Sequence, residues 1–219
     1  MPGRLWQATY GKLFALGYDS VAGAAEKAGL ADVRRELLAQ ARGRTLEIGA
    51  GTGVNAAHYP EAVTELVLTE PDRHMAAKLR RKLQESGRPA EVVEAPGERL
   101  PFADASFDTA VATLVLCTAP GPADVLGEIA RVLKPGGRFL FLEHVRSDDA
   151  GLARWQDRVS PVTNYLFCGC HPNRTTLASI EASALEVERV EHRELPKKGT
   201  LPFERPMIQG TARKPAAAA

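Results

Sequence analysis

Apolar residues along the chain form short continuous runs that alternate with segments of helical spacing. The runs are short enough for strands and are bounded by glycine, proline or polar residues, as strands in a parallel sheet are. They cover 45–48, 66–69, 90–94, 109–117 and 138–145. Between them, apolar residues recur every three or four positions, as in the helix expected after Asp72, with Met75, Leu79 and Leu83 on one face. The alternation predicts an α/β domain with a doubly wound, mostly parallel, Rossmann-like sheet.

Both ends of the chain depart from this alternation. Residues 1–40 carry apolar and aromatic residues at helical spacing, which predicts a helical preface broken near Gly29, acting as a lid or packing on the sheet. Two segments near the carboxyl terminus, 186–194 and 205–213, are expected to be strands of an edge hairpin. We therefore expect one domain at 41–213, followed by a disordered tail at 214–219.

The first strand runs into three glycines spaced two apart, Gly49, Gly51 and Gly53. Alternate glycines allow a sharp turn and let a ligand lie against the backbone. The dinucleotide pattern G-x-G-x-x-G would need a glycine at position 54, where this chain has Val54. A dinucleotide-dependent oxidoreductase is therefore the least favoured interpretation. Glu47, two residues before the first glycine, suits a cationic ligand better than a phosphate. The alternative is an ordinary strand-to-helix turn.

Acidic residues follow the next two strands. Glu70 lies about twenty residues after the first glycine, where a carboxylate can hold both hydroxyls of a ribose. Asp72 suits the N-cap of the following helix. Gly97 and Glu98 follow the third strand, where backbone and an acidic side chain can meet an adenine. These positions strengthen the interpretation as a cofactor site.

Ligands of doubly wound sheets bind outside the carboxyl ends of the strands. The same rule selects Cys117, at the end of the expected fourth strand, and Glu143 and His144, at the end of the fifth. These residues are candidates for a second part of the site.

Composition narrows the class of protein. With 219 residues, 44% hydrophobic and 25% charged, the chain is long enough for one α/β domain. A net charge of +1 and the lack of a dense basic block give no electrostatic support for a nucleic-acid partner. Three cysteines do not make a disulfide framework, and no apolar run of about 18 residues precedes the domain, so a cytoplasmic location is expected.

The combined motifs resemble the class I S-adenosylmethionine-dependent methyltransferases. They are Glu47-x-Gly-x-Gly-x-Gly53, the acid at Glu70, Asp108 opening the fourth strand and the segment 133–137, Leu-Lys-Pro-Gly-Gly. The resemblance covers roughly 18–145 and implies a seven-stranded sheet whose last strand is antiparallel. It implies S-adenosylmethionine as the cofactor.

A narrower likeness is to the methyltransferase-like seven group, the thiol methyltransferases, and its bacterial relatives. It rests on the segments 46–55, 58–60, 113–117, 143–145 and 169–170 with Arg174. The likeness implies methyl transfer to hydrogen sulfide or a small alkyl thiol. Animal members begin with a hydrophobic membrane anchor, whereas this chain starts a few residues before its first expected helix. An integral membrane segment is therefore not expected, and peripheral contact through the aromatic preface stays open, as does the oligomeric state.

Two sets of site residues follow. The cofactor set comprises Glu47, Gly49, Ala50, Gly51, Gly53, Asn55, Glu70, Pro71, Gly97, Glu98 and Leu114. The substrate-pocket set comprises Tyr18, Cys117, Glu143 and Trp155.

A thiol acceptor needs a nearby base or positive potential, because only a small fraction of a thiol is ionised at neutral pH. His144 is the candidate catalytic base, and a structural histidine beside Glu143 is the equal alternative. Cys168-x-Cys170-His171 suggests a metal, but structural zinc needs four ligands and the chain has no second cysteine pair, so no metal site is expected.

Two other functions stay open at this stage. The acceptor of the methyl group is alternatively a phospholipid head group, a quinone or another small molecule, because the cofactor half of the fold does not specify it. The alternative of another class is a non-catalytic module that binds S-adenosylmethionine.

Overall fold

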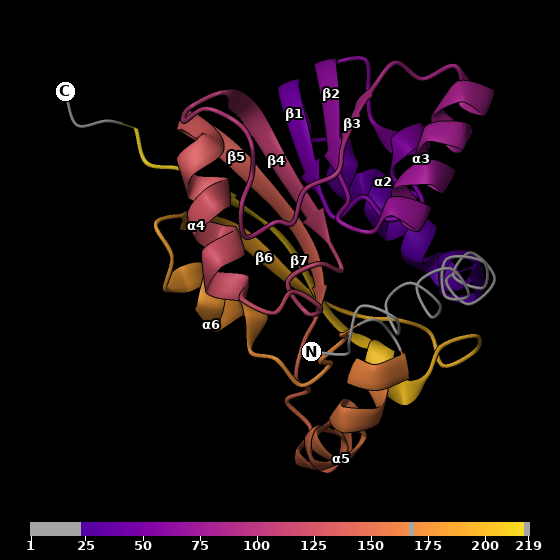
Figure 1. Cartoon of the computed structure of the whole chain (residues 1–219). Helices are drawn as coiled ribbons and strands as arrows, with labels where there is room; N and C mark the ends of the chain where they lie inside the picture. The colour runs from indigo at the N-terminus through magenta and orange to yellow at the C-terminus, as the bar shows by residue number, and fades with distance from the viewer. Residues whose placement is uncertain (1–22, 167–168, 217–219) are drawn as a thin grey trace.

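The structure of the chain is a computed structural model, which describes residues 23–166 and 169–216 (Figure 1). Most of the expected helical preface, including Tyr18, and the cysteine at position 168 lie outside the described residues. No helix in the described part is both long and apolar enough to cross a membrane.

The centre of the fold is one seven-stranded sheet in the order β3-β2-β1-β4-β5-β7-β6. Its strands are β1 (Gly43–Ile48), β2 (Val63–Thr69), β3 (Glu91–Val93), β4 (Phe107–Thr113), β5 (Leu133–His144), β6 (Glu186–Glu194) and β7 (Pro206–Arg213). The first five run parallel, and β7 pairs antiparallel with both β5 and β6. The expected fold class is confirmed, and the last strand of the hairpin is inserted beside β5.

Helices cover both faces of this sheet. They are η1 (Glu26–Leu30), α2 (Ala31–Leu38), η2 (Ala56–His58), α3 (Arg73–Ser86), α4 (Pro122–Val132), α5 (Ala150–Leu166), α6 (Thr176–Glu181) and η3 (Pro202–Glu204). The break expected near Gly29 is a π-helical turn, in which this glycine has φ 126°. Between the glycine loop and β2 the chain forms only the single 3₁₀ turn η2.

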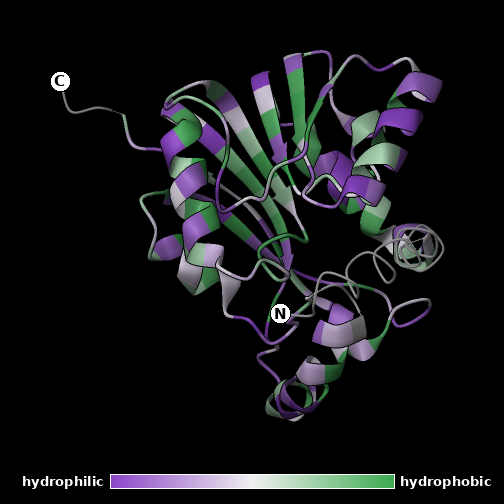
Figure 2. Cartoon of the chain, viewed as in Figure 1, coloured by the Kyte–Doolittle hydropathy of each residue, from purple (hydrophilic) through white to green (hydrophobic). Residues whose placement is uncertain are grey.

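Alternation along the central strands builds two apolar cores. On β5, Phe139 and Phe141 face the core under α4, while Leu140 and Leu142 face the core under α2 and α3. Strand β4 alternates in the same way, with Val111 on the second face. Figure 2 shows apolar residues concentrated on the strands, with polar residues on the outer turns of the helices. The sheet is therefore buried on both faces, as its continuous apolar runs predict.

Strand β4 ends earlier than expected. We expected it to reach Cys117, but it stops at Thr113, and Leu114 adopts a left-handed conformation with φ 61°. A non-glycine residue in this region is uncommon and costs free energy, so surrounding contacts must impose it. The segment 114–119 is thus a loop at the carboxyl edge of the sheet.

Helix α5 lies beyond this carboxyl edge (Figure 1). Its buried Gln156 side chain donates to the carbonyls of Val145 at 3.1 Å and Pro172 at 3.0 Å, and accepts from Ser147 N at 2.8 Å. One amide therefore joins α5 to the segments that follow β5 and α5. At the opposite edge, Lys214, where the tail was expected to begin, still donates its backbone N–H to Gly137.

Gly210 in β7 provides a test of the packing. A Cβ at this position would lie 2.5 Å from the ring of Phe141 and would also overlap the carbonyl oxygen of Arg189. We predict that Gly210→Ala lowers the free energy of unfolding by about 1–3 kcal/mol, since backbone cannot yield as a flexible side chain does.

The matched control is Gly127→Ala in α4, where an added Cβ meets nothing within 4 Å. It should raise stability by about 0.5–1 kcal/mol through helix propensity. Urea denaturation measures the free energy of unfolding of both variants. Equal changes in the two variants would contradict the close packing described for Gly210 in β7.

Candidate active site

The glycine loop between β1 and η2 has the left-handed backbone that its sequence predicts. Gly49, Gly51 and Gly53 have φ 62°, 58° and 82°. A Cβ at Gly49 would lie 2.8 Å from the Val115 side chain, and one at Gly53 would lie 2.5 Å from Leu79. Among the described residues, a Cβ at Gly51 would meet only a methionine methyl, at a van der Waals distance of 3.7 Å. Gly51 is therefore the least crowded of the three glycines, where a ligand can approach the backbone.

Glu70 follows the carboxyl end of β2 and borders this loop. Its carboxylate accepts from the backbone N–H groups of Gly51 and Asp72, both at 2.9 Å. Burial raises the pKa of Glu70 to about 7, although the two backbone hydrogen bonds oppose the shift. Asp72 caps α3 as expected, accepting from His74 N and Met75 N, and Pro71 between the two acids is exposed. Glu70 therefore lies against the glycine loop, and its contact with a ribose stays a prediction.

A buried polar network lies under the glycine loop. The Glu47 carboxylate accepts from Asn55 Nδ2 at 2.9 Å and from Tyr59 Oη at 2.7 Å. Arg34 from α2 donates to Asn55 Oδ1 at 3.1 Å and to Thr113 Oγ1 at 2.8 Å. Burial raises the pKa of Glu47, while Tyr59, Asn55 and the Arg34 charge oppose the shift. Hydrogen bonds between Glu47 and Asn55 therefore stabilise the glycine loop. Direct contact of these two residues with a cofactor stays a prediction.

Arg34, Tyr59 and Thr113 were not predicted as members of this network. Tyr59 belongs to the segment 58–60, which was used only for the resemblance to the thiol methyltransferases. Arg34 belongs to no motif that could be recognised in the sequence. Their positions become apparent only when α2, η2 and β4 are folded against β1.

The loop after β3 packs closely on β1. A Cβ at Gly97 would lie 2.8 Å from the Ile48 side chain, so glycine allows the close approach. Glu98 Oε1 lies 3.5 Å from Gly121 N and accepts a long hydrogen bond from it. The adenine contacts of Gly97 and Glu98 stay predictions.

The carboxylate of Glu143, at the end of β5, holds the loop after β4. Its side chain is fully buried, and its carboxylate accepts from the N–H groups of Val115 at 3.0 Å, Leu116 at 2.9 Å and Cys117 at 3.1 Å. Burial raises the pKa of Glu143 to about 7, and these backbone hydrogen bonds oppose the shift. Both of its oxygens hold the loop after β4. The expected contact of Glu143 with a substrate stays a prediction.

Two cysteines meet the ring of His144 at the end of β5. Cys117 Sγ and Cys170 Sγ each lie 3.9 Å from His144 Nδ1. The cysteines are buried and His144 is half-buried. The Cys117 contact, followed by His144, lowers the pKa of Cys170 against the effect of burial. Burial by itself lowers the pKa of His144, but Cys170 outweighs it and raises that pKa. The structure thus joins two predicted residues, Cys117 and His144, with Cys170.

The turn that carries Cys170 is fixed to the loop after β4. His171 N donates to the carbonyl of Cys117 at 2.8 Å, and Arg174 donates to the carbonyls of Ala119, at 2.7 Å, and of Leu116. The His171 ring pairs with Ser160 and Asn164 on α5. It therefore takes no part in the cysteine cluster.

Trp155 on α5 is 37% exposed, and its ring stacks on Phe203 with centroids 5.9 Å apart. Its expected position in the wall of the acceptor pocket stays a prediction, as does that of Tyr18, which lies outside the described residues.

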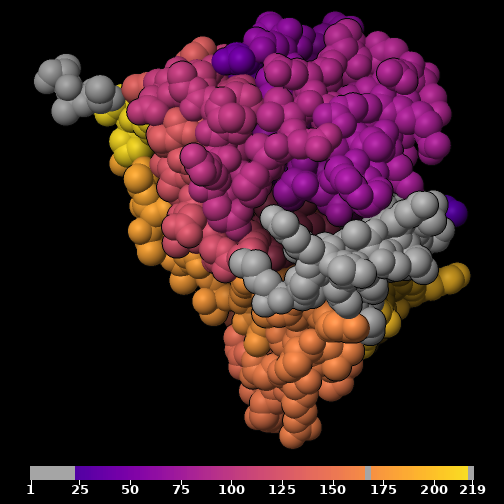
Figure 3. Space-filling view, viewed as in Figure 1, coloured from indigo at the N-terminus to yellow at the C-terminus, as the bar shows by residue number. Residues whose placement is uncertain are grey.

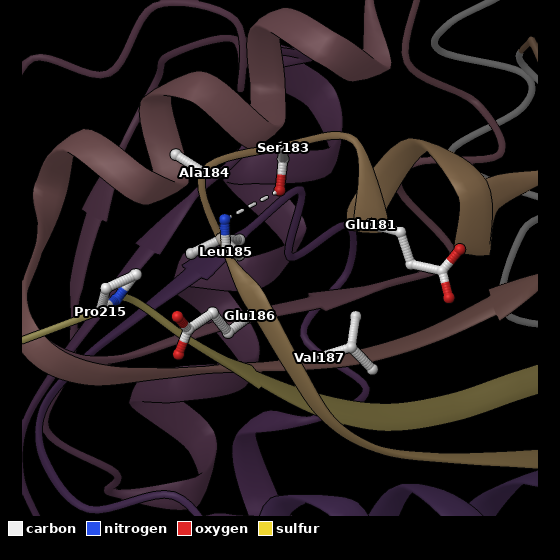
Figure 4. Close-up of a pocket in the computed structure, with 7 residues that line it drawn as sticks. All are labelled: Glu181, Ser183, Ala184, Leu185, Glu186, Val187 and Pro215. Carbon is white, nitrogen blue, oxygen red and sulfur yellow. Dashed lines mark hydrogen bonds between the residues drawn. The ribbon is translucent and has the colours of Figure 1, made fainter.

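The surface has two hollows, one at the carboxyl edge of the sheet and one at the opposite edge. One of about 410 Å³ adjoins the cluster, lined by Leu116, Pro122, His171, Asn173, Arg174, Thr175, Thr176 and Ser179. The other, of about 550 Å³, is lined by Glu181, the segment 183–187 and Pro215 (Figure 4). Because Glu186 pairs with Arg213 and Arg213 with Arg138, the larger hollow lies at the opposite edge of the sheet. In Figure 3 the surface is hollowed between the amino-terminal and middle parts of the chain, near the carboxyl edge.

Several known proteins are similar to this chain in sequence and in fold. Residues 46–141 match the methyltransferase domain family. Thiol S-methyltransferase TMT1B of Homo sapiens is 36% identical over 171 residues, which cover 71% of this chain and 70% of the relative. The chain belongs to the methyltransferase family that includes this enzyme. The family match runs from β1 into β5, so it covers the glycine loop, Glu70 and the loop after β4.

Two further relatives extend the comparison. Phosphatidylethanolamine N-methyltransferase of Cereibacter sphaeroides is 32% identical over 126 residues, covering 57% of this chain and 62% of the relative. The structure of an S-adenosylmethionine-dependent methyltransferase from Thermotoga maritima superposes with a TM-score of 0.70 at 21% identity, covering 93% of this chain and 97% of that one. The fold is therefore that of the S-adenosylmethionine-dependent methyltransferases. The family match and the similarity to TMT1B show that the chain is a methyltransferase.

The residues at the carboxyl edge fit S-adenosylmethionine. Gly51 is the least crowded glycine of the loop among the described residues, and Glu70 offers a carboxylate beside it. The loop 49–55 contains no basic residue that would favour a phosphate. A ligand with an amino group, a sulfonium and a ribose suits this set of donors and acceptors.

The role of Glu143 can be tested by Glu143→Gln. The amide would turn an NH₂ group toward at least one of the three backbone donors and leave that N–H unpaired in the core. We predict a loss of about 1–3 kcal/mol in the free energy of unfolding. Denaturation by guanidinium measures it.

Glu181→Gln on α6 is the control, because Glu181 is exposed; its effect should stay within about 0.5 kcal/mol. A Glu143→Gln protein as stable as this control would show that the three hydrogen bonds do not hold the loop.

Proposed function

We propose that the chain transfers the methyl group of S-adenosylmethionine to the sulfur of hydrogen sulfide or of a small alkyl thiol. The observation that supports it most is the placement of the Cys117–His144–Cys170 cluster beside the glycine loop. Val115 packs on Gly49, and two residues later Cys117 meets His144. One short loop therefore separates the cofactor half of the site from a sulfur- and imidazole-lined half. The similarity to thiol S-methyltransferase TMT1B supports the same acceptor.

On this proposal, residues at β1, β2 and β3 bind the cofactor. Gly51 lets it lie against the backbone, while Gly49 and Gly53 let the loop that borders it pack closely on Val115 and Leu79. Glu70 accepts from the ribose hydroxyls. When bound, S-adenosylmethionine supplies an electrophilic methyl group. The protein then has to align the acceptor with that group, and such alignment is worth effective molarities of about 10⁵ M or more.

The rest of the proposed cofactor set surrounds these groups. It comprises Glu47, Ala50, Asn55, Pro71, Gly97, Glu98 and Leu114. Ala50 N donates to Thr69 O at 2.8 Å, which fixes the glycine loop to β2. Leu114, strained at the end of β4, closes the side toward the acceptor.

The acceptor half has to favour a thiolate over a thiol. With an ordinary thiol pKa of about 8.5, only a few per cent is ionised at neutral pH. We propose that His144 and its two cysteine neighbours border the acceptor's sulfur and supply the base or positive potential that ionisation requires. Trp155 and Tyr18 are proposed to lie farther along the same pocket.

A second acceptor class has one observation in its favour. The similarity to phosphatidylethanolamine N-methyltransferase covers 57% of this chain. A phospholipid head group is therefore the alternative acceptor. It would need no thiolate, so the cysteine cluster would have no role in the reaction.

An acceptor screen distinguishes these candidates. Purified protein is incubated with S-adenosylmethionine labelled in the methyl group and with sulfide, alkyl thiols, phenols, amines or phosphatidylethanolamine vesicles. We expect label in volatile methyl sulfides and in methylated alkyl thiols. Label confined to lipid extracts, or to phenols or amines, would contradict the proposal.

The proposed ribose contact predicts a pH dependence. Ribose hydroxyls donate to the ionised form of Glu70, whose pKa is raised to about 7. Affinity for S-adenosylmethionine should therefore be maximal above pH 7 and fall as pH drops below 7, approaching tenfold per pH unit. Calorimetric titration between pH 5.5 and 8.5 measures this.

Two variants sharpen that experiment. Glu70→Gln should weaken binding by about 10–100-fold at pH 8, the value of charged hydrogen bonds, and remove the pH dependence. Glu94→Gln changes an exposed acid just beyond β3 and should bind like the wild type. Retention of the pH dependence in Glu70→Gln would assign it to another group.

A further inference from the structure

Three side chains from distant parts of the sequence converge at the carboxyl edge. Cys117 comes from the loop after β4, His144 from the last residue of β5, and Cys170 from the turn after α5. One Sγ from each cysteine and one ring nitrogen all lie within 4.8 Å of one another. Both thiols are buried, and the histidine keeps partial access to solvent. Two sulfurs and an imidazole are the ligands that Zn²⁺ prefers.

The spacing of these atoms matches metal coordination. Typical Zn–S and Zn–N bonds of about 2.3 Å and 2.0–2.1 Å imply an S···N separation of about 3.6 Å at tetrahedral angles and about 3.8 Å at trigonal ones. Both observed Sγ···Nδ1 distances are 3.9 Å. They need only a few tenths of an ångström of contraction around an ion. As hydrogen bonds between a thiol and an imidazole, the same contacts lie near the upper limit of distance for sulfur.

The backbone of the two cysteine ligands is held in place. Glu143 accepts from Cys117 N at 3.1 Å, and Cys117 O accepts from His171 N at 2.8 Å. Thr163 Oγ1 donates to the carbonyl of Cys170 at 3.1 Å. Ligands oriented in this way are characteristic of metal sites, whose affinity depends on the groups behind the ligands.

We propose that Cys117, His144 and Cys170 form a three-ligand zinc site whose open fourth position takes the sulfur of the methyl acceptor. Catalytic zinc sites have three protein ligands and keep one position for water or substrate, unlike the four-ligand structural sites. The expectation that no metal binds counted only cysteine pairs close in sequence, and it missed this combination. The inference rests on the proposed thiol acceptor.

The site accounts for how the acceptor is ionised. The acceptor's S–H bond breaks as its sulfur binds the ion, and the proton leaves to solvent. An electron pair on that sulfur then forms the new S–CH₃ bond. The S–CH₃ bond of the sulfonium breaks, and its electrons stay on the sulfur of S-adenosylhomocysteine. The ion supplies the positive potential, and His144 acts as a ligand through Nδ1 and no longer as the base.

Metal binding itself provides the test, without any assay of activity. The full chain is reduced, incubated with Zn²⁺ or Co²⁺, freed of excess ion and analysed by elemental mass spectrometry and absorption. We expect one equivalent of metal per chain and, with Co²⁺, a thiolate charge-transfer band in the near ultraviolet. Addition of an alkyl thiol should change that band, because the thiol enters the fourth position.

Variants assign the ligands. Cys170→Ser and His144→Ala should lose the metal and the band. His171→Gln is the matched control, because this histidine neighbours Cys170 but its ring pairs with α5. It should bind metal like the wild type.

The wild-type result decides the proposal even if a variant fails to fold. Folded, reduced wild type that retains no metal, or a Cys170→Ser protein that retains it in full, would overturn the inference, as would isolation of a Cys117–Cys170 disulfide that persists under reducing conditions. Thiol methylation by metal-free protein would sink the zinc site and leave the proposed function intact. Stoichiometric metal in a protein that methylates no thiol would contradict the proposed function and leave the zinc site intact.

Discussion

The site depends on one buried carboxylate, that of Glu143. An ionised group in the core is costly unless several donors satisfy it, and here the donors are three successive backbone N–H groups, those of residues 115–117. The carboxylate thereby turns the chain sharply after β4 and explains the left-handed Leu114. The loop it holds places Val115 against Gly49 and Cys117 against His144. One interaction in the core therefore sets both halves of the site relative to each other.

A second polar network fixes the cofactor half from below. Arg34 on α2 donates hydrogen bonds to Asn55 and Thr113, and Asn55 in turn donates to the Glu47 carboxylate. Thr113 is also the last residue of β4, immediately before the loop that Glu143 holds. The two networks therefore meet at the carboxyl end of β4. Strain at Leu114 lies at this meeting point, where a functional site is expected to store it.

Local patterns in the sequence were sufficient for the fold and for the glycine loop. The apolar runs located the strands because a parallel sheet buries both faces, and Gly49, Gly51 and Gly53 identify a loop whose conformation other residues resist. Glu70 was predicted from its distance to that loop, and Asp72 was predicted as the N-cap of the helix that follows it. The end of β4 was misplaced because residues 114–117 are as apolar as a strand, and only the distant Glu143 turns them. Cys170 was not grouped with Cys117 and His144, since their proximity is created by the turn after α5 and by no local spacing.

The central claim is that the loop held by Glu143 sets the cofactor and the Cys117–His144–Cys170 cluster face to face. A crystal structure with S-adenosylhomocysteine and an alkyl thiol tests it most directly. The account predicts that the cofactor's sulfur points across the 114–117 loop toward the cluster and that the sulfur of the acceptor lies between them. A ligand whose sulfur points away from the cluster, or an acceptor bound elsewhere on the molecule, would contradict it.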